Sequence, residues 1–594
     1  MKPRSAAPEE QARSSGHGWG RGILLALAAI AVGVGPAWWM NSAYTRSAAQ
    51  RLPAVPALAD KTESLRRAVQ EADRLARAEP ASARRVGELG LLYHANHIYE
   101  PAGQCYLLAV DLEPDNHQWP YYLACLRETC GISDRVEQLL RRVVELSPEF
   151  TPARLRLADG LLKRGDLAAA QVEYERYLQL SRESPYGLLG LARVAMARTD
   201  WPGARKWLEQ AVAADRTFGP AHRLLSTIYE RLGMKEPAQE AQARGSACSR
   251  FRPAPEPLLD RLDDLCHDPL YLLVRANAVK QAFDVNRGMA LLKRAVEVAP
   301  ESSRAHAELG QALRERGELA EARRHLDRAL QLDPANAEAH TGLGFLLGLQ
   351  NDLAGAERCI QEALRHKPAD VNILYGLGKI LYERGAREQA TAKFLQAAEL
   401  SDCRFDDAVE SYVTCLVQAD RHELAISFLQ RVLTPRPTAD RPRLLLARVH
   451  VHRGDPLRAV TVLREGLTVA PYNAPVAHGV ATLLAALPDA SSDQLQEALV
   501  NARRAVDFAK PVDLPEHLDT LAIAQARIGD FTAAMHSEME AIQRAEHMRQ
   551  DARLPELRAH LAEFQAGRAV VRPIRIGSSG GTSYDSPTEG QAGT

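Results

Sequence analysis

The side chains best suited to catalysis or metal binding in this sequence are its eight cysteines and eighteen histidines. A redox pair, a zinc knuckle or a c-type haem site brings two cysteines together as Cys-x-x-Cys, and no two cysteines here have that spacing. Histidines such as His94, His97, His450 and His452 lack accompanying carboxylates or thiolates at ligand spacing. The sequence therefore predicts packed cysteines and packed or solvated histidines, with no metal site and no cofactor.

Glycine motifs that bind nucleotides or expose a nucleophile do not supply a catalytic centre either. The phosphate-binding loop that ends in Gly-Lys-Ser/Thr and the zinc-binding His-Glu-x-x-His pair are both missing. Glycines at 342, 344, 376 and 378 superficially resemble a dinucleotide loop, but they fall inside predicted helices, where they serve packing. The run at 577–581 cannot be a nucleophile elbow, because that motif needs a strand, a turn and a helix. We expect neither an enzyme nor a small-molecule substrate.

The composition indicates a folded, helical chain without a strong charge. Hydrophobic residues make up 46% and charged residues 25% of the 594, as in ordinary folded proteins. Ala, Leu, Arg and Glu favour helices, and strand-like runs of Val, Ile and Thr are scarce. Lys plus Arg number 74 against 75 for Asp plus Glu, so the basic excess typical of nucleic-acid binding is missing. These features predict an all-α fold and no nucleic-acid partner.

A period of 34 residues runs along the chain from Ala83 onward. The clearest unit spans Ser303 to Asn336, and the two units after it repeat its small and apolar positions. Small residues let two helices approach closely, a Gly or Asp forms the turn between them, and Pro ends the second helix. In this unit the positions hold Leu309, Gly310, Leu313, Gly317, Ala322, Leu326, Ala329 and Pro334.

This pattern resembles that of the tetratricopeptide repeat (TPR) family, and the resemblance covers most of residues 83–548. It implies an all-α solenoid, a right-handed superhelix of about thirteen helix-turn-helix units. Within it, the first helix of each unit would line a concave surface. The expected units begin at Ala83, His117, Thr151, Pro185, Gly219, Pro269, Ser303, Ala337, Val371, Asp406, Asp440, Ala474 and Pro515.

Two interruptions divide the repeats. Prolines in residues 253–268 break any continuous helix, and we interpret this segment as a connector between two arrays. An insertion near 488–494 interrupts the unit that begins at Ala474. The expected segments are a first array at 83–252, a second array at 269–548, a stalk or N-capping helix at 45–82, a C-capping helix at 549–576 and a disordered tail at 577–594.

Cys248 and Cys266 flank the connector. A disulfide between them would pin the joint if the repeats are exported to an oxidising compartment. Spacing along the chain does not by itself bring two cysteines together, so this pairing stays open.

An uncharged stretch between Arg21 and Arg46 has the length of a membrane-spanning helix. The apolar run at 22–40 covers roughly 30 Å, and tryptophans stand at both of its ends. The basic residues before it predict a cytoplasmic segment at 1–21, a single-pass anchor at 22–44, and exported repeats in the periplasm or another extracytoplasmic space. A cleaved signal peptide is the alternative, which the length of the apolar run disfavours.

The TPR resemblance also suggests where a protein or peptide would bind. The inner positions of the first helices carry several Tyr and Arg residues, the types that most often anchor protein partners. The family's carboxylate clamp and its asparagine ladder are both missing. The candidate protein-binding groove comprises Tyr121, Tyr122, Arg156, Tyr186, Arg193, Arg223, Phe345, Tyr375, Lys379, Tyr382 and Arg448.

Taken together, these features predict a membrane-tethered scaffold or adaptor that mediates protein–protein interaction in envelope-associated complex assembly. The alternative is a non-catalytic subunit or chaperone of an enzyme or maturation system. Anchored repeat proteins that assist cytochrome c maturation or exopolysaccharide export are similar examples, and the residues do not choose between them.

Overall fold

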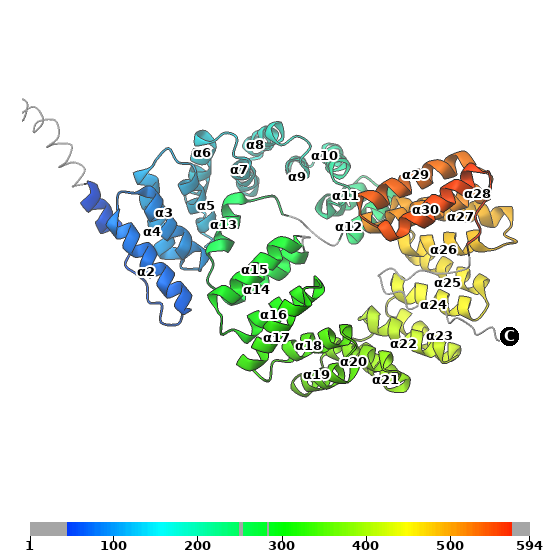
Figure 1. Cartoon of the computed structure of the whole chain (residues 1–594). Coiled ribbons are helices and arrows are strands. Elements are labelled where there is room, and N and C mark those ends of the chain that lie inside the picture. Colours follow the sequence, from blue (N-terminus) through cyan, green and yellow to red (C-terminus); the bar gives the residue numbers. More distant parts are fainter. Residues whose placement is uncertain (1–43, 249–252, 282–283, 573–594) are drawn as a thin grey trace, which may run out of the picture. The chain divides into compact units, whose positions relative to one another are not determined.

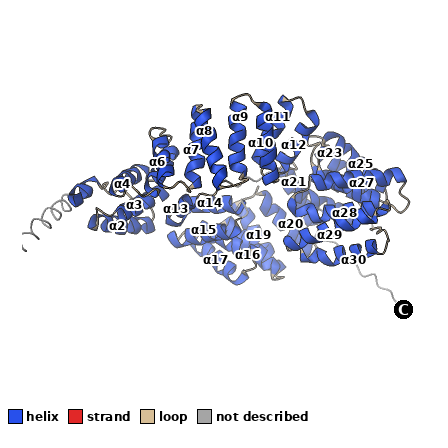
Figure 2. Cartoon of the chain, turned by 90° about the horizontal axis from the view of Figure 1, so that it is seen from above, coloured by secondary structure: helices blue, strands red, loops and turns tan. Residues whose placement is uncertain are grey.

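The computed structural model describes residues 44–248, 253–281 and 284–572. All regular structure in these ranges is helical, without any strand (Figure 2), which confirms the all-α fold. No helix there is both long and apolar enough to cross a membrane. The segment at 1–21, the predicted anchor apart from its last residue, and the tail at 577–594 lie outside the described residues.

The described helices form consecutive pairs, as the 34-residue period predicts (Figure 1). The first helices begin at the expected residues, except that α5 starts one residue later and α28 one residue earlier. In chain order the first five repeats comprise α3 (Ala83–Ala95) and α4 (Tyr99–Leu112), α5 (Gln118–Thr129) and α6 (Val136–Leu146), α7 (Thr151–Arg164) and α8 (Leu167–Leu180), α9 (Pro185–Ala197) and α10 (Trp201–Ala214), and α11 (Gly219–Arg231) and α12 (Lys235–Ala247). A boundary between two compact units falls between α7 and α8.

Eight further pairs follow α13 (Pro257–Leu265). They are α14 (Pro269–Gln281) with α15 (Val285–Val298), α16 (Ser303–Glu315) with α17 (Leu319–Leu332), α18 (Ala337–Leu349) with α19 (Leu353–His366), α20 (Val371–Glu383) with α21 (Arg387–Leu400), α22 (Asp406–Gln418) with α23 (His422–Leu433), α24 (Asp440–His452) with α25 (Pro456–Val469), α26 (Ala474–Ala486) with α27 (Ser492–Asp507), and α28 (Leu514–Arg527) with α29 (Phe531–His547).

Helices at both ends of the repeats cover their apolar faces. At the N-terminal end, α2 (Glu63–Ala78) buries Leu65 and Val69, and it begins where the Thr62 side chain accepts the N–H of Leu65. At the C-terminal end, α30 (Leu554–Gln565) buries Leu557 and Phe564. An end pair has no neighbour to cover its apolar side, so these helices supply that cover.

Glycine is required for two different reasons in these pairs. Gly317 follows α16 with a φ of +79°, the left-handed conformation that lets the chain turn into the next helix. Gly190 allows close approach, because a Cβ there would lie 2.2 Å from the Tyr174 ring. Glycine is therefore needed at one repeat position for the turn between two helices and at another for a close contact between helices.

In ten of the thirteen described repeats, one position of the second helix holds a large buried apolar side chain. It is the twenty-fourth residue of the repeat, which faces the small residues of the first helices. Burial of such a side chain contributes about 1.5–3 kcal/mol relative to exposure. The buried residues at this position include Tyr106, Leu140, Tyr174, Leu208, Leu292, Leu326, Ile360, Phe394, Leu429 and Leu463.

The chain forms two compact units whose boundaries differ from those of the two expected arrays. The first unit contains the residues up to Asp166 together with 255–272, and the second contains 167–254 and 273–594. Most of the connector therefore belongs to the first unit. Its leucines pack on the apolar cluster of that unit, which is the physical reason for the place of the connector.

All eight cysteines are free thiols, so Cys248 and Cys266 form no disulfide in this structure. Cys105 and Cys125 are buried in helices of the first unit, where burial raises the pKa of each thiol to about 12. A thiol held in its neutral form behaves as a small apolar side chain.

Candidate functional site

The connector lies along the first helices of the first unit. We call the surface formed by α3, α5 and α7 the first-helix face. Helix α13 contacts α3 and α5, and Glu256, the residue just before it, reaches Arg156 on α7. Figure 1 shows α13 beside α5, although the two helices are far apart in sequence. The first-helix face is therefore covered by a helical segment of the same chain.

Arg156 holds the start of this segment through its charge. Its Nε donates to Glu256 Oε1 at 2.8 Å and to the Tyr121 hydroxyl at 3.2 Å. Its Nη1 lies 2.6 Å from a carboxylate oxygen of Glu128. The Arg156 and Glu256 side chains are only 27% and 23% exposed. Hydrogen bonds between two ionised groups that are partly shielded from water are among the strongest in proteins.

Tyr121 and Tyr122 lie side by side on α5 beneath the connector, and both are fully buried. The Tyr121 hydroxyl donates to the second carboxylate oxygen of Glu256, and the Tyr122 hydroxyl donates to the carbonyl of Leu258 at 2.9 Å. Burial raises the pKa of Tyr121 well above its ordinary value and that of Tyr122 to about 12. Both hydroxyls therefore keep their protons and act as donors.

One side of α13 is apolar, and the other carries two aspartates and Arg261. Leu258, Leu259, Leu262 and Leu265 are partly buried against the apolar cluster of the first unit. Their spacing of three and four residues places them on one stripe of the helix. The exposed residues of α13 include Asp260 and Asp264. The first-helix face thus accommodates a short helix with a leucine stripe and acidic flanks.

The far end of the connector is held by backbone and side-chain hydrogen bonds. Asn96, at the end of α3, donates from Nδ2 to the carbonyl of Leu265 at 3.0 Å and accepts the N–H of His267 at 2.6 Å. The Ser64 hydroxyl lies 2.8 Å from Nδ1 of His267. Since Asn96 is only 4% exposed, this amide satisfies two buried backbone groups that would otherwise lack partners.

The other eight candidate residues belong to the second unit. Arg193 and Arg223 are exposed, and the remaining six are half-buried. The structure does not gather them into a single site, because they are distributed over five helices. These residues are Tyr186 and Arg193 on α9, Arg223 on α11, Phe345 on α18, Tyr375, Lys379 and Tyr382 on α20, and Arg448 on α24.

Local contacts engage several of these side chains within the second unit. The Tyr186 ring meets Phe218 edge-on with centroids 5.3 Å apart, and the Phe345 ring lies 5.4 Å from the guanidinium of Arg314. Arg448 donates to Glu410 at 3.1 Å. The same Glu410 side chain accepts from Arg441 at 3.0 Å, so α22 and α24 are linked by a two-arginine ion pair.

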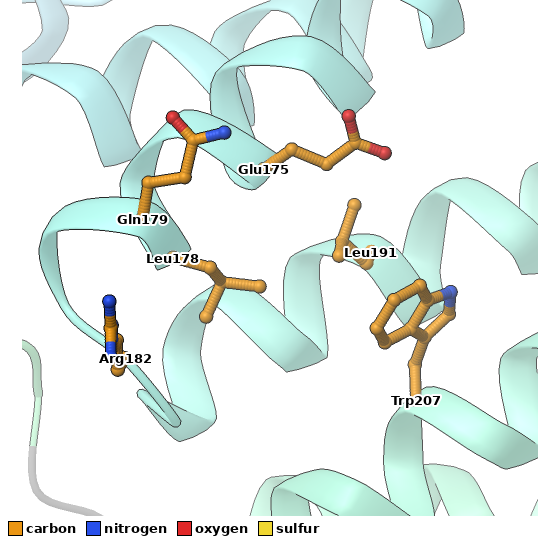
Figure 3. A pocket seen from close by; sticks show the side chains of 6 residues that line it. All are labelled: Glu175, Leu178, Gln179, Arg182, Leu191 and Trp207. Carbon is orange, nitrogen blue, oxygen red and sulfur yellow. The ribbon is translucent and has the colours of Figure 1, made fainter.

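A surface hollow of about 380 Å³ lies among α8, α9 and α10. Figure 3 shows the apolar side chains of Leu178, Leu191 and Trp207 in it, with Glu175 nearby. Gln179 and Arg182 complete its lining. The hollow is apolar with a polar rim, and it includes none of the eleven candidate residues.

The groove predicted from the sequence includes Tyr121, Tyr122 and Arg156, which contact α13 or the preceding Glu256 in the structure, but it does not include Glu256, Glu128 or the docked helix. The connector lies outside the 34-residue period, so no repeat position indicated its place. A signal was nevertheless available, because the leucines at 258, 259, 262 and 265 have helical spacing and follow a glutamate. A short amphipathic helix must cover its apolar side, but the pattern alone does not indicate which surface covers it.

Comparison with protein families identifies TPR motifs in four places. Models described as TPR repeat match residues 310–351, and models described as tetratricopeptide repeat match 161–228, 346–403 and 441–465. None of these matching models describes an enzyme. A search among curated proteins found no match.

Two solved structures are among those that match this chain. The crystal structure of YrrB, described as a TPR protein with an unusual peptide-binding site, has 21% sequence identity and a TM-score of 0.25, and the match covers 30% of this chain and 92% of YrrB. The crystal structure of yeast Tom70 has 15% identity and a TM-score of 0.29, with 72% of this chain and 97% of Tom70 covered.

Proposed function

Because the chain carries tetratricopeptide repeats, we propose that it is a non-catalytic scaffold that binds a partner protein through a helical segment. The binding surface is the first-helix face of the first unit, lined by Tyr121, Tyr122 and Arg156. The observation that carries this proposal is the docked α13 with Glu256 in contact with Arg156. The chain's own connector illustrates the chemistry that this face accepts.

The preferred partner segment follows from that chemistry. A glutamate or aspartate pairs with Arg156 and Tyr121, and leucines at helical spacing take the places of Leu258 and Leu262. Recognition of this kind, an amphipathic helix in a groove, is common among helical receptors. The connector is tethered, so its high effective concentration makes it a competitor that a partner must displace.

The residues of the second unit extend this proposal. We infer that Tyr186, Arg193, Arg223, Phe345, Tyr375, Lys379, Tyr382 and Arg448 provide a further contact surface for the same or a second partner. Tyr and Arg are the side chains that contribute most to protein interfaces. Spreading contacts over several repeats would raise the avidity for an extended partner.

We also propose that the apolar run at 22–44 anchors the chain in a membrane and that the repeats lie outside the cytoplasm. In that arrangement the scaffold serves envelope-associated complex assembly, or acts as a non-catalytic subunit or chaperone of a maturation or export system. The absence of charge between Arg21 and Arg46 supports the anchor, and the preceding basic residues support the orientation.

Site-specific photocrosslinking in native membranes tests the partner. A photoreactive residue at position 128 on α5 is expected to capture a protein, and mass spectrometry of the adduct is expected to find an acidic, leucine-bearing helix at the linkage. The matched control is position 107, an exposed site on the second helix α4. Capture at position 107 alone, or a captured segment without acidic residues, would contradict the proposed surface.

Protease protection tests the topology. In intact cells whose outer permeability barrier has been opened, added protease is expected to degrade the repeats while a cytoplasmic marker stays whole. If the repeats are cut only after the inner compartment is lysed, the proposed orientation is wrong.

A further inference from the structure

The last helix pair departs from the others at the core position of its second helix. Counting from Pro515, the twenty-fourth residue is Glu538, whereas ten other pairs hold a large buried apolar side chain there. By the same count the remaining two pairs carry an exposed Gln242 and a half-buried Glu497. In the second of these pairs the insertion near 488–494 shifts the register, and the buried Ala502 has the spacing to Ala498 and Ala505 that Leu326 has to Ala322 and Ala329. Glu538 is 0% exposed. A carboxylate therefore occupies a place that ordinary repeat packing gives to Leu, Ile, Phe or Tyr.

Two further ligand-type side chains converge on Glu538. Asp519 comes from α28 and His560 from α30, and they are only 2% and 8% exposed. Nδ1 of His560 lies 2.8 Å from Oδ1 of Asp519. One potential ligand atom from each of the three residues lies within 4.8 Å of the other two. Two carboxylates and an imidazole from three different helices thus lie close together.

Glu538 is not satisfied by any donor of the protein. No donor group of the protein reaches either carboxylate oxygen, although both are fully enclosed, and the neighbouring Asp519 carboxyl can form a hydrogen bond with Glu538 only if one of the two is protonated. Burying a polar group without a partner costs several kcal/mol, and an ionised carboxylate costs more. A ligand of positive charge between these side chains would remove that cost.

We propose that Asp519, Glu538 and His560 bind one divalent transition-metal ion, for which Zn²⁺ has the best match. Zinc accepts imidazole nitrogen and carboxylate oxygen at about 2.0–2.2 Å, and such ligand atoms stand roughly 3–4 Å apart around the ion. The ligand atoms of the cluster lie within 4.8 Å of one another, and an ion between them would replace the 2.8 Å hydrogen bond between Asp519 and His560. Three protein ligands leave a fourth position for water.

The charges around the cluster balance when such an ion is bound. Asp519 and Glu538 together neutralise its two positive charges. Arg572 contacts the other oxygen of Asp519 and pairs with Glu556 at 2.9 Å, so it has a counter-charge of its own. These outer residues orient the ligands, as the surrounding shell does in other metal sites.

A proton is the competing occupant of this space. Burial and the adjacent Asp519 raise the pKa of Glu538 to about 9, so without a cation the Glu538 carboxyl is neutral at pH 7. The two alternatives differ in their consequences. A bound metal ion would link α28, α29 and α30 and so hold the end helix on the last pair. A protonated Glu538 would leave a cluster that does not bind added zinc.

Calorimetric titration of the full chain in detergent, stripped with a chelator and with its exposed Cys130 alkylated, tests the proposal. With Zn²⁺ alone as the probe, the wild-type chain is expected to bind one ion more than Glu538→Leu does, with at least a hundredfold loss of affinity in the variant. Zinc is also expected to raise the midpoint of thermal unfolding of the wild type and to leave that of Glu538→Leu unchanged. Equal stoichiometry and equal stabilisation in the two proteins would overturn the metal site.

Two controls keep the result interpretable. Glu540→Gln alters an exposed carboxylate on the same helix that pairs with Arg544, and it is expected to bind zinc like the wild type. Glu538→Leu restores the residue type of the other pairs, so it is expected to fold at least as well as the metal-free wild type. A metal-free Glu538→Leu chain that folds while the wild type shows no zinc binding would identify Glu538 as a protonated core residue.

Discussion

Reversing the charge of Arg156 with Arg156→Glu is expected to release α13 from the first-helix face. The variant places a carboxylate between Glu256 and Glu128, which Arg156 joins in the wild type. Breaking a largely buried ion pair by removing one partner costs about 3–5 kcal/mol. Hydrogen exchange of the backbone amides at 257–265 is therefore expected to speed up by about a hundredfold or more, since 1.4 kcal/mol is a factor of about ten.

Restoring the opposite charge tests whether the pair itself is responsible. Glu256→Arg, added to Arg156→Glu, recreates a pair of opposite sign and is expected to recover most of the protection of α13. Arg141→Glu is the control, because Arg141 pairs with Glu137 at the surface with 45% of its side chain exposed, and such pairs contribute less than about 1 kcal/mol. Unchanged exchange in Arg156→Glu would show that the leucines alone hold α13.

Truncation of Phe394 with Phe394→Ala is expected to be the most destabilising substitution in the second unit. The ring is 3% exposed, packs 5.7 Å from Tyr375, and fits against Gly378, where a Cβ would lie 2.6 Å from it. Phe-to-Ala changes in cores cost about 3–5 kcal/mol. In a stacked array each pair contacts only its neighbours, so the loss is expected to concentrate in α19–α22.

Hydrogen exchange resolved by segment measures this locality. The amides of α20 and α21 are expected to lose protection, while those of α9 and α10 keep theirs. Leu424→Ala removes a leucine that is 46% exposed, and it is expected to change protection little. A uniform loss over the second unit in Phe394→Ala would contradict nearest-neighbour stacking.

The repeat frame could be predicted from the sequence because packing dictates it. Gly310 and Gly342 both face Leu326 at distances that no larger residue tolerates without a shift, so the spacing of these residue types encodes the helix pairs. Because the spacing rule is strict, a residue that departs from it is informative. Glu538 occupies the repeat position of Leu326 and Phe394, so the repeat pattern predicts that it is buried. Its proximity to His560 cannot be predicted in this way, because it depends on how α30 packs against the last helix pair.

The docked connector could not be derived in this way. It has no repeat register, and its contacts with Tyr121, Tyr122 and Arg156 join residues separated by 100 positions or more along the chain. Inner-face positions identified these three side chains as suited to binding a peptide. That the connector of the same chain covers these side chains follows from the tertiary packing of its four leucines. The sequence pattern does not specify that packing.

Peptide binding to the uncovered face tests the central claim most directly. In the full chain, residues 254–268 are replaced by a Gly/Ser linker of equal length, and a fluorescent peptide with the native 254–268 sequence is titrated by anisotropy. We expect saturable binding in the micromolar range, a free energy of about 8 kcal/mol, and at least a tenfold loss when the peptide carries Glu256→Lys. Absence of saturable binding, or equal affinity of the two peptides, would contradict recognition of an acidic, leucine-bearing helix by this face.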